Sequence, residues 1–396
     1  MKKKILWIMM PIFVAILTVI CLNNFLDKKI EALLKTKDLK AINIEYGSTY
    51  KDRGVIYDEY LTENNYLLLE GSSELAAPVT QVPIYTFPAK GVEKFATTGR
   101  AYSQDLKQIS VLGGQDTDKK DRKVAMILSL QWFMSKDGID DTSFQANFSP
   151  SQFYALLSNP NIKEEHKKKY ASRVDSVLAK TSQFAPEKIY AKVYANDGVQ
   201  YKLLHLLFEP YFFPRENIVK LKDKGLLYRK LITLPDKGED TQVKVIDWDQ
   251  EYKKAQEQGK SQVSNNEFMV YDSYYDKYLK DNLQTQKDSN KNVDLMKSKE
   301  FEDYELYLDI CADLNIKPYI VLAPTNGRWY DYTGMTKESR DEFFDKIEEM
   351  AKKRGFEVLN LKNEEYEPYF ICDVMHLGWK GWTRVNEELY KHFKDQ

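Results

Sequence analysis

Histidine and cysteine, which carry much of protein site chemistry, are scarce in this chain: 4 and 3 among 396 residues. No cluster of them has the spacing of metal ligands, so we expect neither a metal site nor a cofactor. Three cysteines are compatible with an exported protein that does not depend on disulfides. An excess of basic residues is also missing: 58 Lys and Arg against 60 Asp and Glu argue against a general nucleic-acid binder.

One long run without charge lies near the N-terminus. It extends from Ile5 to Leu22, which as a helix would measure about 27 Å, close to the hydrocarbon thickness of a bilayer. Three lysines at positions 2–4 precede it, so the positive-inside rule predicts a cytoplasmic N-terminus, although two lysines at 28–29 follow. A cleaved signal peptide is the alternative, but the run is long and no Ala-x-Ala site follows it.

These features predict two parts. We expect residues 1–27 to form a cytoplasmic tip and a transmembrane anchor, and residues 28–396 to form one extracytoplasmic domain of a single-pass membrane protein. In that domain Cys311 and Cys372 could pair, but we favour two buried thiols.

The exported part has the pattern of an α/β fold. Short apolar runs at 65–71, 124–130, 318–323 and 356–359 predict buried strands, and helical patterns at 299–314, 337–353 and 379–393 lie between and after the later runs. Strands that alternate with helices indicate a parallel sheet covered on both faces. From about 145 to 300 the sequence predicts a helical insertion, with helices at 163–183 and 197–209, an N-cap at Ser149 before Pro150, and a loop at 236–264.

Two distant motifs could share one catalytic site. Gly71-Ser72-Ser73 directly follows the first predicted strand, where a serine hydroxyl can project from the carboxyl end of the sheet toward helical N–H groups. Asp373-Val374-Met375-His376 precedes the last predicted helix. His376 could serve as a base, with Asp373 holding its other ring nitrogen. Each motif alone is weak, because Gly-x-Ser often only caps a helix; the two in this order are more specific.

With these motifs the sequence resembles the SGNH (GDSL-like) hydrolase superfamily. The resemblance implies a three-layer α/β/α fold with Ser73 as nucleophile, His376 as general base and Asp373 as its orienting acid; Ser72 replaces the superfamily's usual Asp. The superfamily's Gly and Asn oxyanion blocks are not plainly present. The candidates for oxyanion donors are the Ser73 N–H, Gly99 and the side-chain amides of Gln131 and Asn326.

Further stretches resemble the DltD family of membrane-anchored proteins of teichoic-acid D-alanylation in Gram-positive bacteria. They are GSSEL at 71–75, LQWF at 130–133, NGRWYDYTG at 326–334 and DVMHLGW at 373–379. The resemblance implies acyl transfer through a D-alanyl-serine intermediate. Its implied partners are teichoic or lipoteichoic acid, other D-alanylation membrane proteins, and a donor that is a D-alanyl carrier protein or a membrane acyl-relay protein. A D-alanyl (thio)esterase and a non-catalytic scaffold remain as alternatives.

Within these stretches Ser72, Trp132, Trp329 and Tyr330 are the candidates for substrate contact. A mildly acidic domain would have to meet a polyanionic teichoic acid with a local basic patch. A basic run at 163 and 167–169 offers one, although a solvated helix face is the simpler interpretation.

Overall fold

A computed structural model describes residues 2–238 and 243–396, with the side chains of residues 2–9 and 12 left aside. A five-stranded parallel sheet forms its centre, in the order β2-β1-β3-β4-β5. The strands are β1 (Leu67–Glu70), β2 (Phe95–Thr98), β3 (Val124–Ser129), β4 (Tyr319–Ala323) and β5 (Val358–Asn360). The predicted α/β class is confirmed, as are four of the strands; β2 was not predicted.

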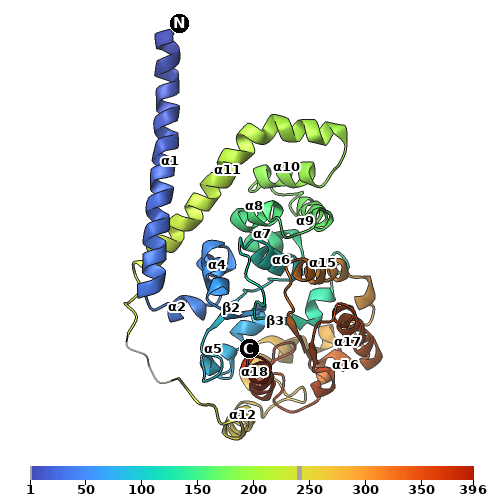
Figure 1. Ribbon diagram of the computed structural model, residues 1–396. Helices are drawn as coiled ribbons and strands as arrows, with labels where there is room; N and C mark the ends of the chain where they lie inside the picture. The colour runs from blue at the N-terminus through green and yellow to red at the C-terminus, as the bar shows by residue number, and fades with distance from the viewer. Residues whose placement is uncertain (1, 239–242) are drawn as a thin grey trace.

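Both faces of the sheet are buried, because side chains alternate along each strand. Leu68, with the β3 and β4 side chains that share its face, packs into one apolar cluster together with α6 and α15. Leu67 and Leu69 belong to a second cluster, where Trp379 and Trp382 of α18 cover the opposite face. Figure 1 shows α6 and α15 above the strands and α18 below them. The result is a three-layer arrangement with the sheet in the middle.

The helices vary greatly in length. The ones that cover the sheet or position the site are α5 (Pro83–Thr86), α6 (Asp105–Gly113), α15 (Glu300–Asp313), α16 (Gly327–Tyr332), α17 (Lys337–Lys352) and α18 (Trp379–Phe393). The remaining ones are α1 (Lys2–Thr36), α2 (Lys40–Asn43), α3 (Thr49–Asp52), α4 (Ile56–Glu63), α7 (Asp141–Asn147), α8 (Pro150–Ser158), α9 (Glu164–Val177), α10 (Ala185–Tyr194), α11 (Val199–Leu231), α12 (Trp248–Gln262), α13 (Asp272–Tyr274) and α14 (Leu283–Gln286).

The segment between β3 and β4 is mostly helical. Helix α8 begins as predicted, with the Ser149 hydroxyl accepting a hydrogen bond from the Gln152 N–H. Helix α11 extends to Leu231, well beyond the predicted end at 209, with Pro210 and Pro214 inside it. The prediction of a loop at 236–264 is wrong at its C-terminal end, where α12 forms; residues 239–242 of that stretch lie outside the described residues.

The N-terminal helix α1 contains the run that was predicted to cross a membrane. The side chains of residues 5–9 and 12 of that run lie outside the described set. Among the residues that are described, none of the helices combines the length and the apolar character that a membrane crossing requires. The C-terminal half of α1 packs along α11, where Phe25 meets Tyr228 edge to face at 6.2 Å and Lys224 pairs with Asp27 at 2.5 Å.

The three cysteines are free thiols in the described structure. Cys311 is buried in the cluster above the sheet and Cys372 in the cluster below it. Burial raises the pKa of both thiols well above the usual value. They therefore behave as small apolar core side chains.

Candidate functional site

The carboxyl end of β1 presents the serine motif. Gly71 follows the strand directly, donates its N–H to the Thr98 carbonyl at 3.0 Å and accepts from the Gln108 amide at 2.9 Å. Ser73 then begins a 3-10 turn that extends to Ala76. The Ser73 side chain is partly exposed, whereas Ser72 and Glu74 on either side of it are buried. The turn therefore presents one hydroxyl of the two serines at the protein surface.

Close backbone packing supports this turn. A Cβ on Gly99 would lie 2.0 Å from the Gly71 carbonyl oxygen, and Gly99 has φ +140°, a conformation that side-chain-bearing residues rarely adopt. The Gly99 N–H and the Thr98 hydroxyl both donate to Asp52 at 3.1 Å. Burial raises the pKa of Asp52, and the neighbouring Lys51 opposes that shift. A glycine is thus required where β2 passes the serine turn.

The second motif lies in a tight loop before α18. Ile371 and Leu377 form an antiparallel bridge, and the Cys372 N–H donates to the His376 carbonyl at 2.9 Å. Inside this loop Asp373 Oδ1 accepts the N–H groups of Met375 and His376, both at 2.8 Å. The loop orients its own carboxylate through the backbone, so Asp373 Oδ2 is directed at the imidazole.

The structure brings the two motifs together. His376 Nδ1 lies 2.7 Å from Asp373 Oδ2, and His376 Nε2 lies 3.0 Å from Ser73 Oγ. A carboxylate can only accept, so Nδ1 carries the proton and Nε2 accepts from the Ser73 hydroxyl. The His376 side chain is 19% exposed. The hydroxyl, imidazole and carboxylate thus have the geometry that nucleophile, base and orienting acid take in serine acyl-transfer sites.

Opposing influences set the charge of His376. Burial disfavours the protonated ring, but the hydrogen bond and the charge of Asp373 outweigh burial, and Glu74 adds to them. The net effect raises the pKa of His376 above its usual value of 6.5. A base with a raised pKa is a stronger proton acceptor when it is neutral, so the pairing assists removal of the Ser73 proton.

Glu74 is a further residue of this site that the sequence analysis missed. It is fully buried beside the candidate nucleophile and accepts the Ser72 N–H at 2.9 Å. Its other oxygen accepts the Ser129 hydroxyl and, at 3.1 Å, the Gln131 amide. Glu74 therefore ties the serine turn to the carboxyl end of β3. Its position within GSSEL was a usable signal. A charged residue so close to a buried strand is seldom buried unless it is paired, so the sequence could have indicated polar partners for Glu74.

The four candidate oxyanion donors lie in different settings. Ser73 is the first residue of a helical turn, and N–H groups at that position make no hydrogen bond within the turn, so the Ser73 N–H is free of such a bond. The Gly99 N–H is instead directed at Asp52, and the Gln131 amide at Glu74. The Asn326 amide donates to the carbonyls of Phe268 at 2.8 Å and Asp373 at 3.1 Å, and its oxygen caps α16. Gly99 and Asn326 thus support the site instead of facing an oxyanion.

The predicted substrate contacts are mostly buried. Ser72 is 2% exposed, and its hydroxyl donates to the Arg100 carbonyl at 3.3 Å. Trp132 and Trp329 pack in the apolar cluster above the sheet, and Trp329 meets Phe268 edge to face at 5.2 Å. Tyr330 is also buried, near enough to Asp373 that this carboxylate adds to the burial that raises the Tyr330 pKa. In this conformation the protein itself therefore covers most of the surface of these side chains.

Two further features bear on ligands. Three of the four lysines of the basic run pair with carboxylates: Lys163 with Asp313 at 3.1 Å, Lys167 with Glu164 at 3.2 Å, and Lys168 with Asp197. Across residues 2–238 and 243–396, no group of three or more His, Cys, Asp or Glu side chains is placed to hold a metal ion.

Comparisons with known proteins assign the chain to a family. A family model described as "DltD protein" matches residues 43–394. Protein DltD of Bacillus subtilis is 30% identical over 342 residues, which cover 86% of this chain and 85% of the relative. Protein DltD of Staphylococcus aureus is 29% identical over 354 residues, covering 86% and 84%, and that of Lacticaseibacillus rhamnosus is 26% identical over 413 residues, covering 100% and 93%. The chain therefore belongs to the DltD family.

Proposed function

We propose that this chain is a serine acyltransferase that places D-alanine on teichoic acid through an ester on Ser73. Membership of the DltD family implies a role in teichoic-acid D-alanylation. The observation that carries the finer proposal is the continuous hydrogen-bond chain from Ser73 Oγ through His376 to Asp373. Such a chain activates a hydroxyl that is otherwise a weak nucleophile.

The first half-reaction loads the enzyme. His376 Nε2 takes the Ser73 proton while Oγ attacks the carbonyl of a D-alanyl donor. The oxyanion of the tetrahedral intermediate is held by the Ser73 N–H. As the intermediate collapses, the bond to the donor's leaving group breaks, and His376 returns its proton to that group. The product is a D-alanyl ester on Ser73, with the D-alanyl carrier protein or a membrane acyl-relay protein as the proposed donor.

The second half-reaction unloads it. His376 takes the proton of a teichoic-acid hydroxyl, whose oxygen attacks the ester carbonyl. Collapse breaks the bond to Ser73 Oγ, which recovers its proton from His376. The polymer then carries the D-alanyl ester, and the enzyme is regenerated. Water in place of the polymer hydroxyl would make the same site a D-alanyl esterase.

The proposal includes a membrane location. The charge-free sequence from Ile5 to Leu22 and the three lysines before it support an N-terminal anchor with its tip in the cytoplasm. Residues 28–396 then form the extracytoplasmic domain. The short link between α1 and the domain would keep the site near a membrane-resident substrate.

Neighbouring serines offer a matched test. We expect Ser73→Ala to abolish D-alanyl ester on teichoic acid in cells, and Ser72→Ala to retain most of it, because Ser72 is buried and donates only to a backbone carbonyl. Immunoblotting is the control that both variants are present in equal amounts. Wild-type ester with Ser73→Ala would refute the nucleophile and favour a scaffold.

A second assay separates transfer from hydrolysis. The purified full chain is incubated with a D-alanyl thioester, with and without lipoteichoic acid. A transferase gives polymer-bound D-alanine that depends on the acceptor. Release of D-alanine at the same rate with and without the polymer would identify a (thio)esterase.

A further inference from the structure

The N-terminal half of α11 exposes an unusual amount of apolar surface. Val199 is 81% exposed, Leu206 70%, Phe213 66% and Leu207 65%, and Leu203 is also exposed. We call these five residues the outer face of α11. Contiguous exposed apolar surface is uncommon on proteins that are surrounded by water alone, and it marks a contact with a partner or a membrane.

The N-terminal half of α11 is apolar both toward the protein and away from it. At about 100° per residue, the outer-face residues fall on one side of the helix, near 199, 203 and 206. On the opposite side the buried Phe212 packs against Tyr190 of α10 at 4.7 Å, and the partly exposed His205 meets the same ring at 5.8 Å. A helix on a water-covered surface turns its apolar stripe inward. Here an apolar stripe also points away from the protein.

The outer face lies at the end of the molecule that carries the N-terminus. In Figure 1 the N-terminal part of α11 crosses the top of the domain above α10. Its C-terminal part descends to α1, which extends upward past both. Helix α1 also exposes apolar side chains along its upper half, among them Phe13, Ile16 and Ile20. Lower down the two helices are held together by Lys224, which bonds Asn23 at 2.6 Å and Asp27 at 2.5 Å. The apolar surfaces of α1 and α11 thus face the same surroundings.

We propose that the outer face of α11 lies in the lipid bilayer, as a second, interfacial contact in addition to the α1 anchor. The inference rests on the proposed membrane location of α1. A bilayer that surrounds the upper half of α1 would lie against this end of the domain, and Leu and Phe side chains on one face are what an interfacial helix inserts. Lys202 and Glu209, on the flank of the same helix, remain able to reach the headgroup region.

Two membrane contacts would fix the orientation of the domain, which a single contact cannot do. A single helix leaves a domain able to swing about its attachment, whereas a second contact on α11 fixes the domain's tilt. The position of Ser73 relative to the bilayer would then be constant. The outer face is therefore assigned to orientation of the domain on the membrane.

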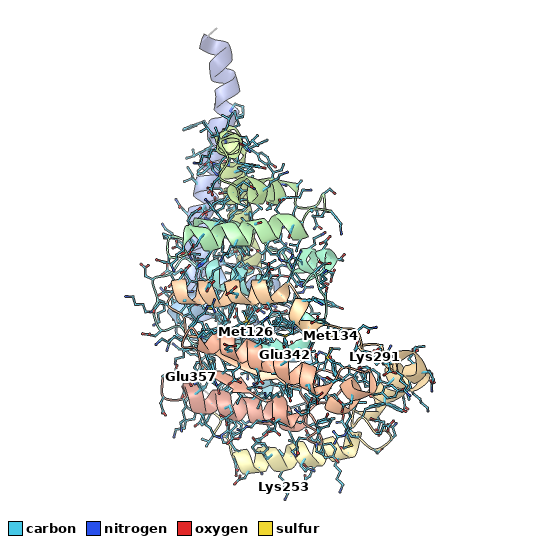
Figure 2. The ribbon with its side chains drawn as sticks, turned by 90° about the vertical axis from the view of Figure 1, so that its right-hand side faces the viewer. Met126, Met134, Lys253, Lys291, Glu342 and Glu357 are labelled. Atoms are coloured by element: carbon cyan, nitrogen blue, oxygen red, sulfur yellow. The ribbon has the colours of Figure 1, made fainter. Side chains whose placement is uncertain are left out.

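Spin labels can measure this contact in the full chain. In a Cys21→Ser background, with Cys311 and Cys372 buried, single cysteines are introduced as Leu206→Cys on the outer face, Leu17→Cys on α1 and Lys253→Cys on α12. Lys253 is exposed at the end opposite the N-terminus (Figure 2). The chain is reconstituted in nanodiscs of phosphatidylglycerol and phosphatidylethanolamine, and collisions of each nitroxide with oxygen and with a water-soluble nickel chelate are recorded.

Oxygen concentrates in lipid and the nickel chelate in water. We expect labels at 206 and 17 to collide more with oxygen, and the label at 253 to collide more with nickel. A label at 206 that matches 253 while 17 lies in lipid would overturn the α11 contact and leave the anchor intact. A label at 17 in water would overturn the anchor, and the position of 206 would then decide the α11 contact by itself. Dipolar broadening between labels at 206 would assign the face to a second copy of the chain and refute the lipid contact.

Discussion

Asp373→Asn tests how the catalytic loop sets the proton position on His376. Asp373 Oδ1 accepts two backbone N–H groups at 2.8 Å, so in the variant that position must remain an oxygen. The new amide NH2 then faces His376 Nδ1, which must become an acceptor. The proton moves to Nε2, and the ring can no longer accept from Ser73. We expect acylation of Ser73 to slow by about a thousand- to ten-thousandfold, which corresponds to roughly 4–5.5 kcal/mol of barrier.

The assay is the single-turnover rate of D-alanyl transfer from a thioester to the purified full chain. Asp313→Asn is the matched control, because Asp313 pairs with the buried His166 at 2.5 Å in the same manner, away from Ser73. The control should lower the melting temperature, at a cost of about 1–3 kcal/mol, and leave the acylation rate unchanged. If Asp373→Asn kept more than about a tenth of the rate, the loss would be under about 1.4 kcal/mol and the tautomer argument would be refuted.

Three further outcomes follow from the same geometry. Glu74→Gln places an NH2 against at least one donor among Ser72, Ser129 and Gln131. It should therefore lower the free energy of unfolding by about 1–3 kcal/mol in thermal melts and slow acylation of Ser73. Acylation at the wild-type rate in both Glu74→Gln and Glu74→Ala would contradict the positioning role. Gly99→Ala forces a Cβ to within 2.0 Å of the Gly71 oxygen and should cost about 3 kcal/mol or more in denaturant melts; an unchanged midpoint would contradict it. Acylation should rise with pH through a midpoint above 6.5, because the ring must be neutral to act as a base, and a midpoint below 6.5 would contradict the raised pKa of His376.

The raised pKa of His376 affects stability and activity in opposite directions as the pH changes. The folded chain holds the His376 proton more tightly than the unfolded chain does, because Asp373 pairs with the ring. This contribution to the free energy of unfolding is therefore complete below the unfolded pKa and is lost as pH rises through the folded value. Activity and this part of the stability thus change in opposite directions across the same pH range.

The sheet was predictable where its strands are apolar on both faces. Strands β1, β3 and β4 are runs such as VAMILS that have few alternatives to burial. Strand β2 was missed because it has four residues, two of them threonines, and pairs on one side only. Its place at the sheet edge depends on pairing with β1, which is nearly thirty residues away, and no local pattern contains that contact.

Helix α12 shows a different limit. Its buried residues are Ala255 and Gly259, one turn apart. A Cβ on Gly259 would lie 2.6 Å from the Tyr369 Cβ, so the helix packs closely through small residues and shows no large apolar stripe. The stretch therefore looked like a polar loop, although Asp247 caps the helix by accepting the Gln250 N–H.

The candidate site also contains parts that were predictable from local sequence and parts that were not. Ser73, Asp373 and His376 carry local motifs, and their types and order were enough to predict them. The supporting contacts were not predictable, because Glu74 meets Ser129 and Gln131 from β3 and its following turn, and Gly99 meets Asp52 from α3. Asn326 was one of the candidate oxyanion donors, and its amide bonds the Asp373 carbonyl, a contact that only the folded loop creates.

The Ser73 ester is the intermediate on which the proposed reaction depends. The purified full chain is mixed with a D-alanyl thioester, quenched in acid before acceptor is added, digested and examined by peptide mass spectrometry. We predict one D-alanyl group on Ser73, absent from Ser73→Ala and present in Ser72→Ala. A chain that transfers D-alanine at the normal rate with the group on another residue, or on none, would contradict the proposed mechanism.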